Sequence, residues 1–191
     1  MNIHPIFPTI VAEFDLSNNP TVHNLKELID NTQSIQAIEH GLVDNGFSSY
    51  GWNKNILNEK EFLPLKKVFL DCINQYSDAV SLGDLIISNS WYNKFLQGGK
   101  IAAHRHEGSV CSAAFYPYVD KDSANIRFHS PLKPYRMNEL FGDENYFNTY
   151  FWEFPAKKDT LYIFPSWLEH ETNVNYSNER YVISFNTERV K

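Results

Sequence analysis

The stretch Arg180-Tyr181-Val182-Ile183-Ser184-Phe185-Asn186 decides the fold class, because its side chains alternate in polarity with a period of two. Successive side chains of an extended strand point to opposite faces, so Tyr181, Ile183 and Phe185 share an apolar face. Arg180 heads the other face. We expect the apolar face to pack against helices, and the face of Arg180 to look into the interior of the fold or into a ligand cavity.

Four stretches upstream have the composition of further strands. They are rich in β-branched and aromatic residues, and Gly, Pro, Asn and Asp separate them. They cover Leu85–Phe95, Ser109–Val119, Ile126–His129 and Thr160–Phe164. Several short strands with few helices among them predict an antiparallel sandwich or jelly roll and argue against a doubly wound α/β fold.

The first part of the chain has a helical period instead. Apolar residues recur at steps of three and four from Phe62 to Val80, which predicts an amphipathic helix. Residues 7–16 predict a short edge strand. Asn19-Pro20 predicts the start of an earlier helix, whose apolar stripe is Val22, Leu25, Leu28 and Ile29.

These patterns predict a mainly β protein with one domain over residues 1–191. Residues 1–83 are expected to form a helical N-terminal support that covers the apolar face of the final strand. Residues 84–191 are expected to form the jelly-roll core. A length of 191 residues suits one well-buried core and leaves little room for a second.

Composition narrows the function classes. The formal net charge of −6 argues against a large phosphate-binding surface, so nucleic acid is not an expected partner. Cys72 and Cys111 are too few and too far apart for a disulfide framework, and we expect both to be reduced and buried. The first residues lack the order of a signal peptide, and no apolar run approaches membrane-spanning length. The expected setting is the cytoplasm, without a membrane partner.

Three of the seven histidines form a candidate metal site. In an extended His104-Arg105-His106 segment, residues two apart point the same way, so both imidazoles can reach one ion. His170 is the best candidate for a third ligand. An HxH pair alone is a weak signal, since many such pairs are chance surface histidines.

The residues after His170 strengthen this interpretation. Arg180 follows ten positions later, across a turn rich in Asn and Ser, so a hairpin would bring the two residues close together. A metal-binding imidazole beside a buried guanidinium suits a chelating dicarboxylate. One end of the dicarboxylate would bind the metal, and the other would form a two-pronged ion pair with the arginine.

At this point the chain resembles the iron(II)/2-oxoglutarate-dependent dioxygenase superfamily, and within it a little-characterised branch found in bacteria and their phages. The resemblance implies a double-stranded β-helix (jelly roll), an iron(II) cofactor and 2-oxoglutarate as co-substrate. The segments that carry it are Phe7-Pro8-Thr9, Ser90-Trp91-Tyr92-Asn93, Gly99 leading into His104-Arg105-His106, Phe115-Tyr116, Ser130-Pro131, Phe164-Pro165-Ser166-Trp167-Leu168-Glu169-His170, Asn175-Tyr176-Ser177-Asn178-Glu179-Arg180 and Ile183-Ser184-Phe185-Asn186.

The resemblance implies that His104, His106 and His170 bind the metal, with no catalytic residue beyond these ligands. It implies that Arg180 binds the far carboxylate of 2-oxoglutarate. Ser184 is a candidate for a further hydroxyl donor, and so is either Tyr116 or Tyr118, although core packing explains a buried tyrosine equally well.

One position departs from the superfamily pattern. The usual HxD…H triad has a carboxylate two residues after the first histidine, and this chain has His106 there. Three neutral imidazoles leave the ion one charge more positive than a triad with one carboxylate does. Glu107 faces away from His104 in an extended strand and is held in reserve as a ligand, in case the backbone turns at Gly108.

Other polar residues receive weaker assignments. Asn93 and Asn186 are candidate hydrogen-bonding members of the pocket. His129 is expected to be a satisfied polar group at a strand end. The aromatic-rich segment 132–160 is either a loop packed on its own aromatics or a lid over the site.

The expected function is a hydroxylase dependent on iron(II) and 2-oxoglutarate, in a bacterial or phage-infected cell. Its substrate, a small molecule or a side chain, is not indicated by the sequence. One alternative is a three-histidine dioxygenase that does not use 2-oxoglutarate, and another is a non-catalytic jelly-roll binding module. An exposed sheet edge also leaves a homodimer open.

Overall fold

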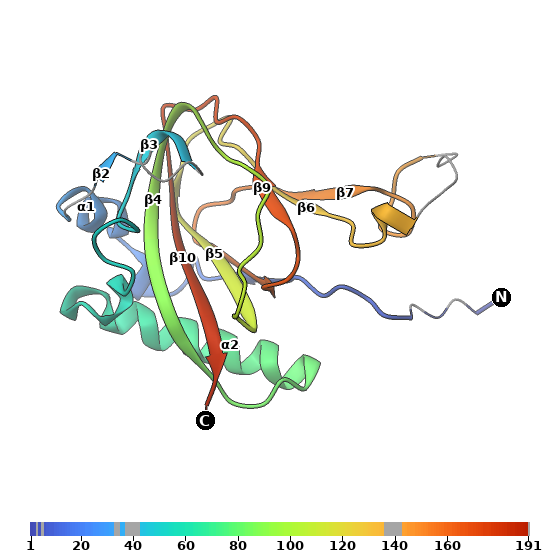
Figure 1. Ribbon diagram of the computed structural model, residues 1–191. Helices are drawn as coiled ribbons and strands as arrows, with labels where there is room; N and C mark the ends of the chain where they lie inside the picture. Colours follow the sequence, from blue (N-terminus) through green and yellow to red (C-terminus); the bar gives the residue numbers. More distant parts are fainter. Residues whose placement is uncertain (3, 5, 33–34, 37–42, 136–142, 191) are drawn as a thin grey trace.

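The strands of the protein form two antiparallel sheets in a computed structural model that describes all residues except 3, 5, 33–34, 37–42, 136–142 and 191 (Figure 1). The larger sheet has the strand order β1-β8-β5-β10-β4-β3-β2, and the smaller has the order β7-β6-β9. The strands are β1 (Ala12–Asp15), β2 (Ile35–Gln36), β3 (Val43–Ser48), β4 (Leu85–Ile101), β5 (Cys111–Val119), β6 (Ile126–His129), β7 (Phe151–Phe154), β8 (Thr160–Pro165), β9 (His170–Thr172) and β10 (Glu179–Arg189).

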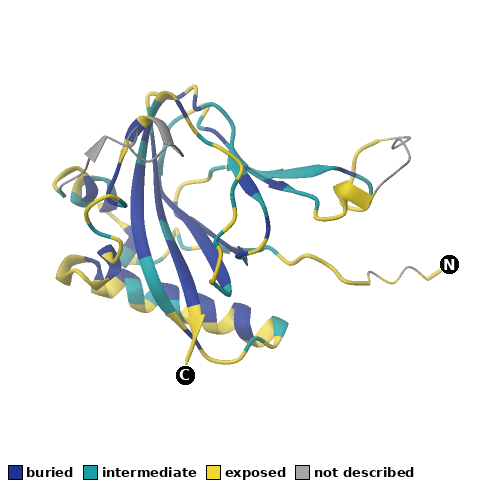
Figure 2. Ribbon diagram, in the orientation of Figure 1, coloured by how far each residue is buried: buried dark blue, intermediate teal, exposed yellow. Residues whose placement is uncertain are grey.

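Two α-helices lie on the outer face of the larger sheet. They are α1 (Leu25–Asp30) and α2 (Leu63–Val80), and short 3₁₀ turns cover Pro20–Val22, Ile56–Asn58, Lys60–Phe62 and Lys133–Tyr135. The buried side of α2 faces the sheet (Figure 2). There the ring centroid of Phe69 lies 5.2 Å from that of Phe115 and 5.2 Å from that of Phe185. The predicted amphipathic helix and its place on the sheet are confirmed.

The alternation in the final strand is also confirmed. Tyr181, Ile183 and Phe185 are buried in one apolar cluster with residues of both helices. Val182 belongs to a second cluster on the opposite face, which it shares with Phe128 of the smaller sheet. The polar face of β10 therefore looks into the space between the two sheets. Because Arg180 is on this face, its side chain enters the interior.

The first helix differs from its prediction. The side chain of Asn19 accepts a hydrogen bond from the backbone N–H of Thr21, so the chain is capped where expected. The helix does not continue, because Asn24 has a φ of 63° and separates the 3₁₀ turn from α1. Val22 and Ile29 are still buried in the same cluster, so the apolar stripe persists across the break.

Several strand boundaries differ from the sequence patterns. The predicted edge strand 7–16 is confined to Ala12–Asp15, because its partner β8 pairs only with these residues. Conversely, β4 continues past Phe95 to Ile101. Four strands, β2, β3, β7 and β9, were not predicted. β9 has the composition His-Glu-Thr, which does not favour a strand, and it forms through pairing with β6.

The described part of the aromatic segment contains the 3₁₀ turn Lys133–Tyr135 and the strand β7. β7 pairs antiparallel with β6 (Figure 1). Residues 136–142 of this segment lie outside the described residues. Both cysteines are free and buried, as predicted. Within the described part of the chain, no helix is long and apolar enough to span a membrane.

Candidate metal centre

The three predicted histidines come from two segments that the backbone fastens together. His104 and His106 lie in the loop after β4, and His170 is the first residue of β9. The backbone N–H of His104 donates to the carbonyl of His170 at 3.0 Å, and the N–H of His170 donates back to His104 at 3.0 Å. The N–H of His106 donates to the carbonyl of Ser166 at 3.0 Å.

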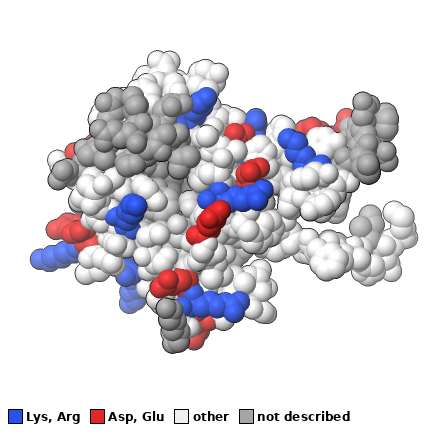
Figure 3. Space-filling model, in the orientation of Figure 1, with Lys and Arg blue, Asp and Glu red and all other residues white. Residues whose placement is uncertain are grey.

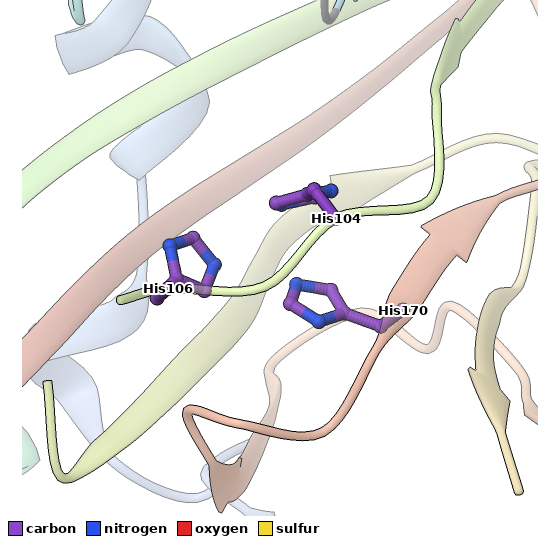
Figure 4. A group of neighbouring side chains, drawn as sticks. All are labelled: His104, His106 and His170. Atoms are coloured by element: carbon purple, nitrogen blue, oxygen red, sulfur yellow. The ribbon is translucent and has the colours of Figure 1, made fainter. Parts of the chain in front are cut away.

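This pairing brings the three imidazoles around one space (Figure 4). One ring nitrogen from each residue lies within 4.8 Å of the others. The ring centroids of His104 and His170 are 4.3 Å apart, and that of His106 is 5.0 Å from the first and 5.1 Å from the second. The predicted convergence of two neighbouring imidazoles and a distant one is confirmed.

Hydrogen bonds to carbonyls determine which nitrogen two of the rings present. Nδ1 of His104 lies 2.8 Å from the carbonyl oxygen of Ala102, and Nδ1 of His170 lies 2.9 Å from that of Leu168. A carbonyl can only accept, so each Nδ1 carries the proton. Each Nε2 then keeps its lone pair for a metal, the arrangement that second-sphere contacts impose at metal-binding histidines.

Burial keeps these rings neutral. It lowers the pKa of His170 to about 3, helped by the neighbouring His104. It lowers the pKa of His106 to about 4, again with a contribution from His104, and it also lowers the pKa of His104. A neutral imidazole is the form that binds a metal, so all three are ready as donors near neutral pH.

The carboxylates near the centre do not join the cluster. Glu107 is exposed in a turn with Gly108, whose φ is 77°. The backbone does turn there, but the cluster of candidate ligands consists of the three histidines and does not include Glu107. Glu169 lies near Arg105 instead, with 3.6 Å between carboxylate and guanidinium. The described residues therefore offer a site with three neutral donors.

Arg180 lies in the same pocket with part of its guanidinium unpaired. The residue is 1% exposed, and its Nε and Nη1 atoms have no hydrogen-bond partner among the described residues. Nη2 donates to the Tyr116 hydroxyl at 3.4 Å. The guanidinium carbon also lies 4.8 Å from the ring centroid of Phe95 and 5.2 Å from that of Tyr116. Buried charges are normally paired, so these two unpaired donors fit a carboxylate ligand.

The pocket that contains these groups has a volume of about 260 Å³. The three histidines, Arg180, Tyr116 and Ser184 all contribute to its wall. The residues present thus fit a metal ion at one end and a dicarboxylate that reaches from the metal to the arginine. Asn93 also lines the pocket, whereas Asn186 does not.

Tyr118 points away from the pocket. The reason is that the pairing of β5 with β10 changes register between Tyr181 and Ile183 of β10. This β-bulge lies around Pro117, turns Tyr118 to the helix side, and leaves Tyr116 inside. The Tyr118 hydroxyl donates to Asp120 at 2.6 Å. Of the two tyrosine candidates, only Tyr116 lies beside Arg180.

His129 and the described residues of the aromatic segment lie outside the pocket wall. Nε2 of His129 is 3.1 Å from the Glu171 carboxylate, so this residue is a satisfied polar group at a strand end, as predicted. The described residues of segment 132–160 do not line the pocket. Its Tyr146 ring instead packs on Trp152 at 4.2 Å between centroids. This agrees with a segment that packs on its own aromatics.

Four aromatic residues that line the pocket were missed as site residues: Tyr50, Trp91, Phe95 and Phe164. Trp91 and Tyr50 line the pocket, and their ring centroids are 5.2 Å apart at an angle of 77°. Trp91 also lies 5.8 Å from the ring of His106. Its neighbours in the Ser90-Trp91-Tyr92-Asn93 motif were a signal for this role. Tyr50 carried no comparable signal, because it lies in an irregular segment after β3.

The chain is similar in sequence to one protein family and in structure to several solved proteins. A family described as "Putative 2OG-Fe(II) oxygenase" matches residues 89–186. None of the curated proteins matches the sequence. HygX from Streptomyces hygroscopicus, solved with nickel, 2-oxoglutarate and hygromycin B bound, aligns with a TM-score of 0.67 and 9% identity, over 95% of this chain and 84% of HygX.

Two hydroxylases are similar in structure as well. A Pseudomonas putida prolyl-4-hydroxylase aligns with a TM-score of 0.66 and 11% identity, over 96% of this chain and 94% of that enzyme. The viral collagen prolyl hydroxylase of Paramecium Bursaria Chlorella virus-1 aligns with a TM-score of 0.59 and 12% identity, over 94% and 96%. At such identities the likeness shows the fold, and it confirms the predicted double-stranded β-helix.

Proposed function

Because the chain belongs to the 2OG-Fe(II) oxygenase family, we propose that it is a hydroxylase that holds iron(II) through His104, His106 and His170 and binds 2-oxoglutarate through Arg180. The family match spans about half of the chain, residues 89–186, and includes all four of these residues. One observation supports the assignment of roles above the others. Three converging imidazoles and a guanidinium with unpaired donors share one pocket.

In this proposal the histidines bind the metal through nitrogen atoms that the fold keeps unprotonated. The Nδ1–H groups of His104 and His170 are engaged by backbone carbonyls, so Nε2 of each faces the ion. When bound, the iron supplies the oxygen chemistry, which oxidises 2-oxoglutarate to succinate and carbon dioxide and hydroxylates a second substrate. The protein orients both reactants and excludes competing reactions.

Arg180 binds the carboxylate of 2-oxoglutarate that is remote from the metal. Its Nε and Nη1 atoms are the donors without a partner, and a carboxylate can accept from a guanidinium in a two-pronged manner. The Tyr116 hydroxyl, which already accepts from Nη2, and the Ser184 hydroxyl are further donors on the same wall. The apolar surroundings of Phe95 and Val182 keep water from weakening this ion pair.

The substrate of the proposed hydroxylase is a small molecule or a side chain. Both kinds occur among the similar structures: HygX was solved with hygromycin B, and the Pseudomonas enzyme is named for prolyl 4-hydroxylation. Neither substrate transfers to this chain at the identities observed. On the face shown in Figure 3, basic side chains are interspersed with acidic ones, which supports an occupant other than nucleic acid.

The test of the proposal is turnover of 2-oxoglutarate. Purified protein with iron(II), oxygen and 2-oxoglutarate is expected to form succinate, and chelation of the iron is expected to stop it. His170→Ala is expected to abolish succinate formation while the fold, followed by circular dichroism, is retained. Iron-dependent succinate formation that survives His170→Ala would contradict the assigned metal site.

The third histidine also supports a second candidate, a three-histidine dioxygenase that activates oxygen without 2-oxoglutarate. In that case Arg180 would hold a carboxylate of the substrate itself. The same assay separates the two functions. The candidate gains support if iron binds at the three histidines and succinate does not form, and iron-dependent succinate formation contradicts it.

A further inference from the structure

A row of polar side chains crosses the larger sheet next to the loop that carries His106, and the proposed function assigns it no role. Asn186 of β10 lies directly opposite Asn89 of β4 on one side and Ser112 of β5 on the other. Ser166 follows the end of β8. Ser112 is 1% exposed, Ser166 0% and Asn186 5%. Such burial demands that each polar atom finds a partner.

Each of these side chains donates a hydrogen bond to the next one, in the order Ser166, Ser112, Asn186 and Asn89. Nδ2 of Asn186 donates to Oδ1 of Asn89 at 2.9 Å, and Oδ1 of Asn186 accepts from the Ser112 hydroxyl at 2.7 Å. The one proton of Ser112 is thereby used. The contact of 2.7 Å between the two serine hydroxyls must then run from Ser166 to Ser112. The row fixes the position of Ser166 against the sheet.

Ser166 in turn holds the metal-binding loop through its backbone. Its carbonyl accepts from the N–H of His106 at 3.0 Å, and its own N–H donates to the carbonyl of Val110 at 3.2 Å. These bonds fasten both ends of the segment from His106 to Val110. The side chain of Ser166 therefore connects the sheet to the peptide of one candidate ligand.

His106 depends on this anchoring more than its partners do. The rings of His104 and His170 are each oriented by a hydrogen bond from Nδ1 to a nearby carbonyl. No such bond orients the ring of His106 among the described residues, and its aromatic neighbour outside the cluster is Trp91 at 5.8 Å. The position of the third donor thus follows mainly from the position of its backbone.

We propose that Ser166, Ser112 and Asn186 are positioning residues that hold His106 in place as the third metal donor, an inference that rests on the proposed metal site. Ser166 and Asn186 belong to the Phe164–His170 and Ile183–Asn186 segments, and the proposed function gives neither residue a role. Outer contacts of this kind typically change metal affinity by about 10–100-fold.

The test is a double-variant cycle on metal affinity, with cobalt(II) as the probe and calorimetry and visible absorption as readouts. Ser166→Ala is expected to weaken cobalt(II) binding by about 10–100-fold and to shift the absorption spectrum toward that of His106→Ala. The double variant Ser166→Ala/His106→Ala is expected to bind cobalt(II) no more weakly than His106→Ala alone, because Ser166 acts only through His106.

The matched control is Ser77→Ala. Ser77 is also buried, and its hydroxyl donates to the carbonyl of Gly83 at the end of α2, away from the pocket. This variant is expected to keep the cobalt(II) affinity and spectrum of the wild type. If Ser166→Ala does not fold, Ser112→Ala removes the same connection one residue further from His106 and is expected to give the same non-additive pattern.

The outcomes separate this inference from the function on which it rests. Wild-type protein that binds cobalt(II), together with a Ser166→Ala variant of unchanged affinity, would overturn the positioning role and leave the metal site standing. Losses that add in the double variant would overturn it too, because they would show a general structural effect. Wild-type protein that does not bind cobalt(II) would overturn both.

Discussion

Arg180 combines almost complete burial with two guanidinium nitrogens that lack a partner in the part of the chain that the structure describes. A buried charge without a counter-charge is costly for folding. The ring faces of Phe95 and Tyr116 offset part of this cost, because a cation is attracted to an aromatic face. The part of the cost that is not offset lowers the free energy of unfolding, and it accompanies a guanidinium that is free to bind a ligand.

Because Arg180 lowers the stability of the fold and is proposed to bind 2-oxoglutarate, Arg180→Met is expected to affect stability and binding in opposite directions. The free energy of unfolding without ligands is expected to stay unchanged or to rise, because an unpaired buried charge is removed. The affinity for 2-oxoglutarate is expected to fall by about 10–100-fold, the equivalent of one charge-assisted hydrogen bond or two. Urea denaturation and calorimetry measure the two quantities. A variant that loses stability and keeps its affinity would refute the role of Arg180.

His106 stands where the superfamily has a carboxylate, and the structure places its ring in the cluster with His104 and His170. Three neutral donors stabilise iron(III) less than two neutral donors and a carboxylate do, because the higher charge gains more from an anionic ligand. The departure was visible in the sequence once it was compared with the HxD…H pattern of the superfamily it resembles. The sequence could not exclude Glu107, because that choice depends on a turn at Gly108 that only the structure shows.

His106→Asp is therefore expected to lower the reduction potential of the bound iron. A shift of about 60 mV corresponds to a tenfold change in the preference for iron(III), and we expect at least this size. Spectroelectrochemical titration of the iron-loaded variant and wild type measures it. The His106→Asn variant, which adds no charge, is the control. Equal potentials for wild type and His106→Asp would show that residue 106 does not bind the metal.

At the scale of elements, long periodic segments were predictable and short ones were not. α2 and β10 follow from patterns within their own residues. β9 does not, because three polar residues form a strand only where β6 offers a partner. The break at Asn24 and the bulge at Pro117 also depend on tertiary contacts. The bulge decides that Tyr116, and not Tyr118, lies beside Arg180.

α1 is fastened to the sheet by a network of charges that responds to pH. Asp30 of α1 contacts Lys26 at 2.8 Å and Lys94 of β4 at 3.1 Å, and both lysines also contact Glu179 of β10. Burial alone would raise the pKa of Asp30, but hydrogen bonds from Lys26, Tyr181 and Lys94 outweigh it and lower the pKa to about 2.

Asp30→Asn is expected to lower the free energy of unfolding by about 1 kcal/mol near neutral pH, a modest value because these side chains are partly exposed. A carboxyl with a depressed pKa stabilises the fold above its ordinary pKa of 3.8, and this contribution is lost as the pH falls toward 2. Denaturant unfolding should therefore show the difference between wild type and variant shrinking in that range. A difference that grows on acidification would contradict this explanation.

At the scale of the whole molecule, the site lies between a helix-supported sheet and a smaller sheet that carries His170. The larger sheet supplies Arg180, Tyr116 and Ser184 from its inner face. The loop after β4 supplies His104 and His106 and docks on the segment that leads into β9. The sequence predicted the jelly roll and the three histidines that converge in the pocket. It could not predict that Tyr50 joins Trp91 in the pocket wall, because Tyr50 lies in an irregular segment and the two rings meet only through folding.

In the proposed site, His104, His106 and His170 share one metal ion beside a carboxylate that is bound to Arg180. A crystal structure of the protein grown without oxygen, with iron(II) and 2-oxoglutarate, tests it through anomalous scattering at the iron edge. We predict one anomalous peak at about 2.0–2.2 Å from a ring nitrogen of each histidine, and a 2-oxoglutarate carboxylate on the Arg180 guanidinium. An iron peak away from these rings, or 2-oxoglutarate bound without Arg180, would contradict it.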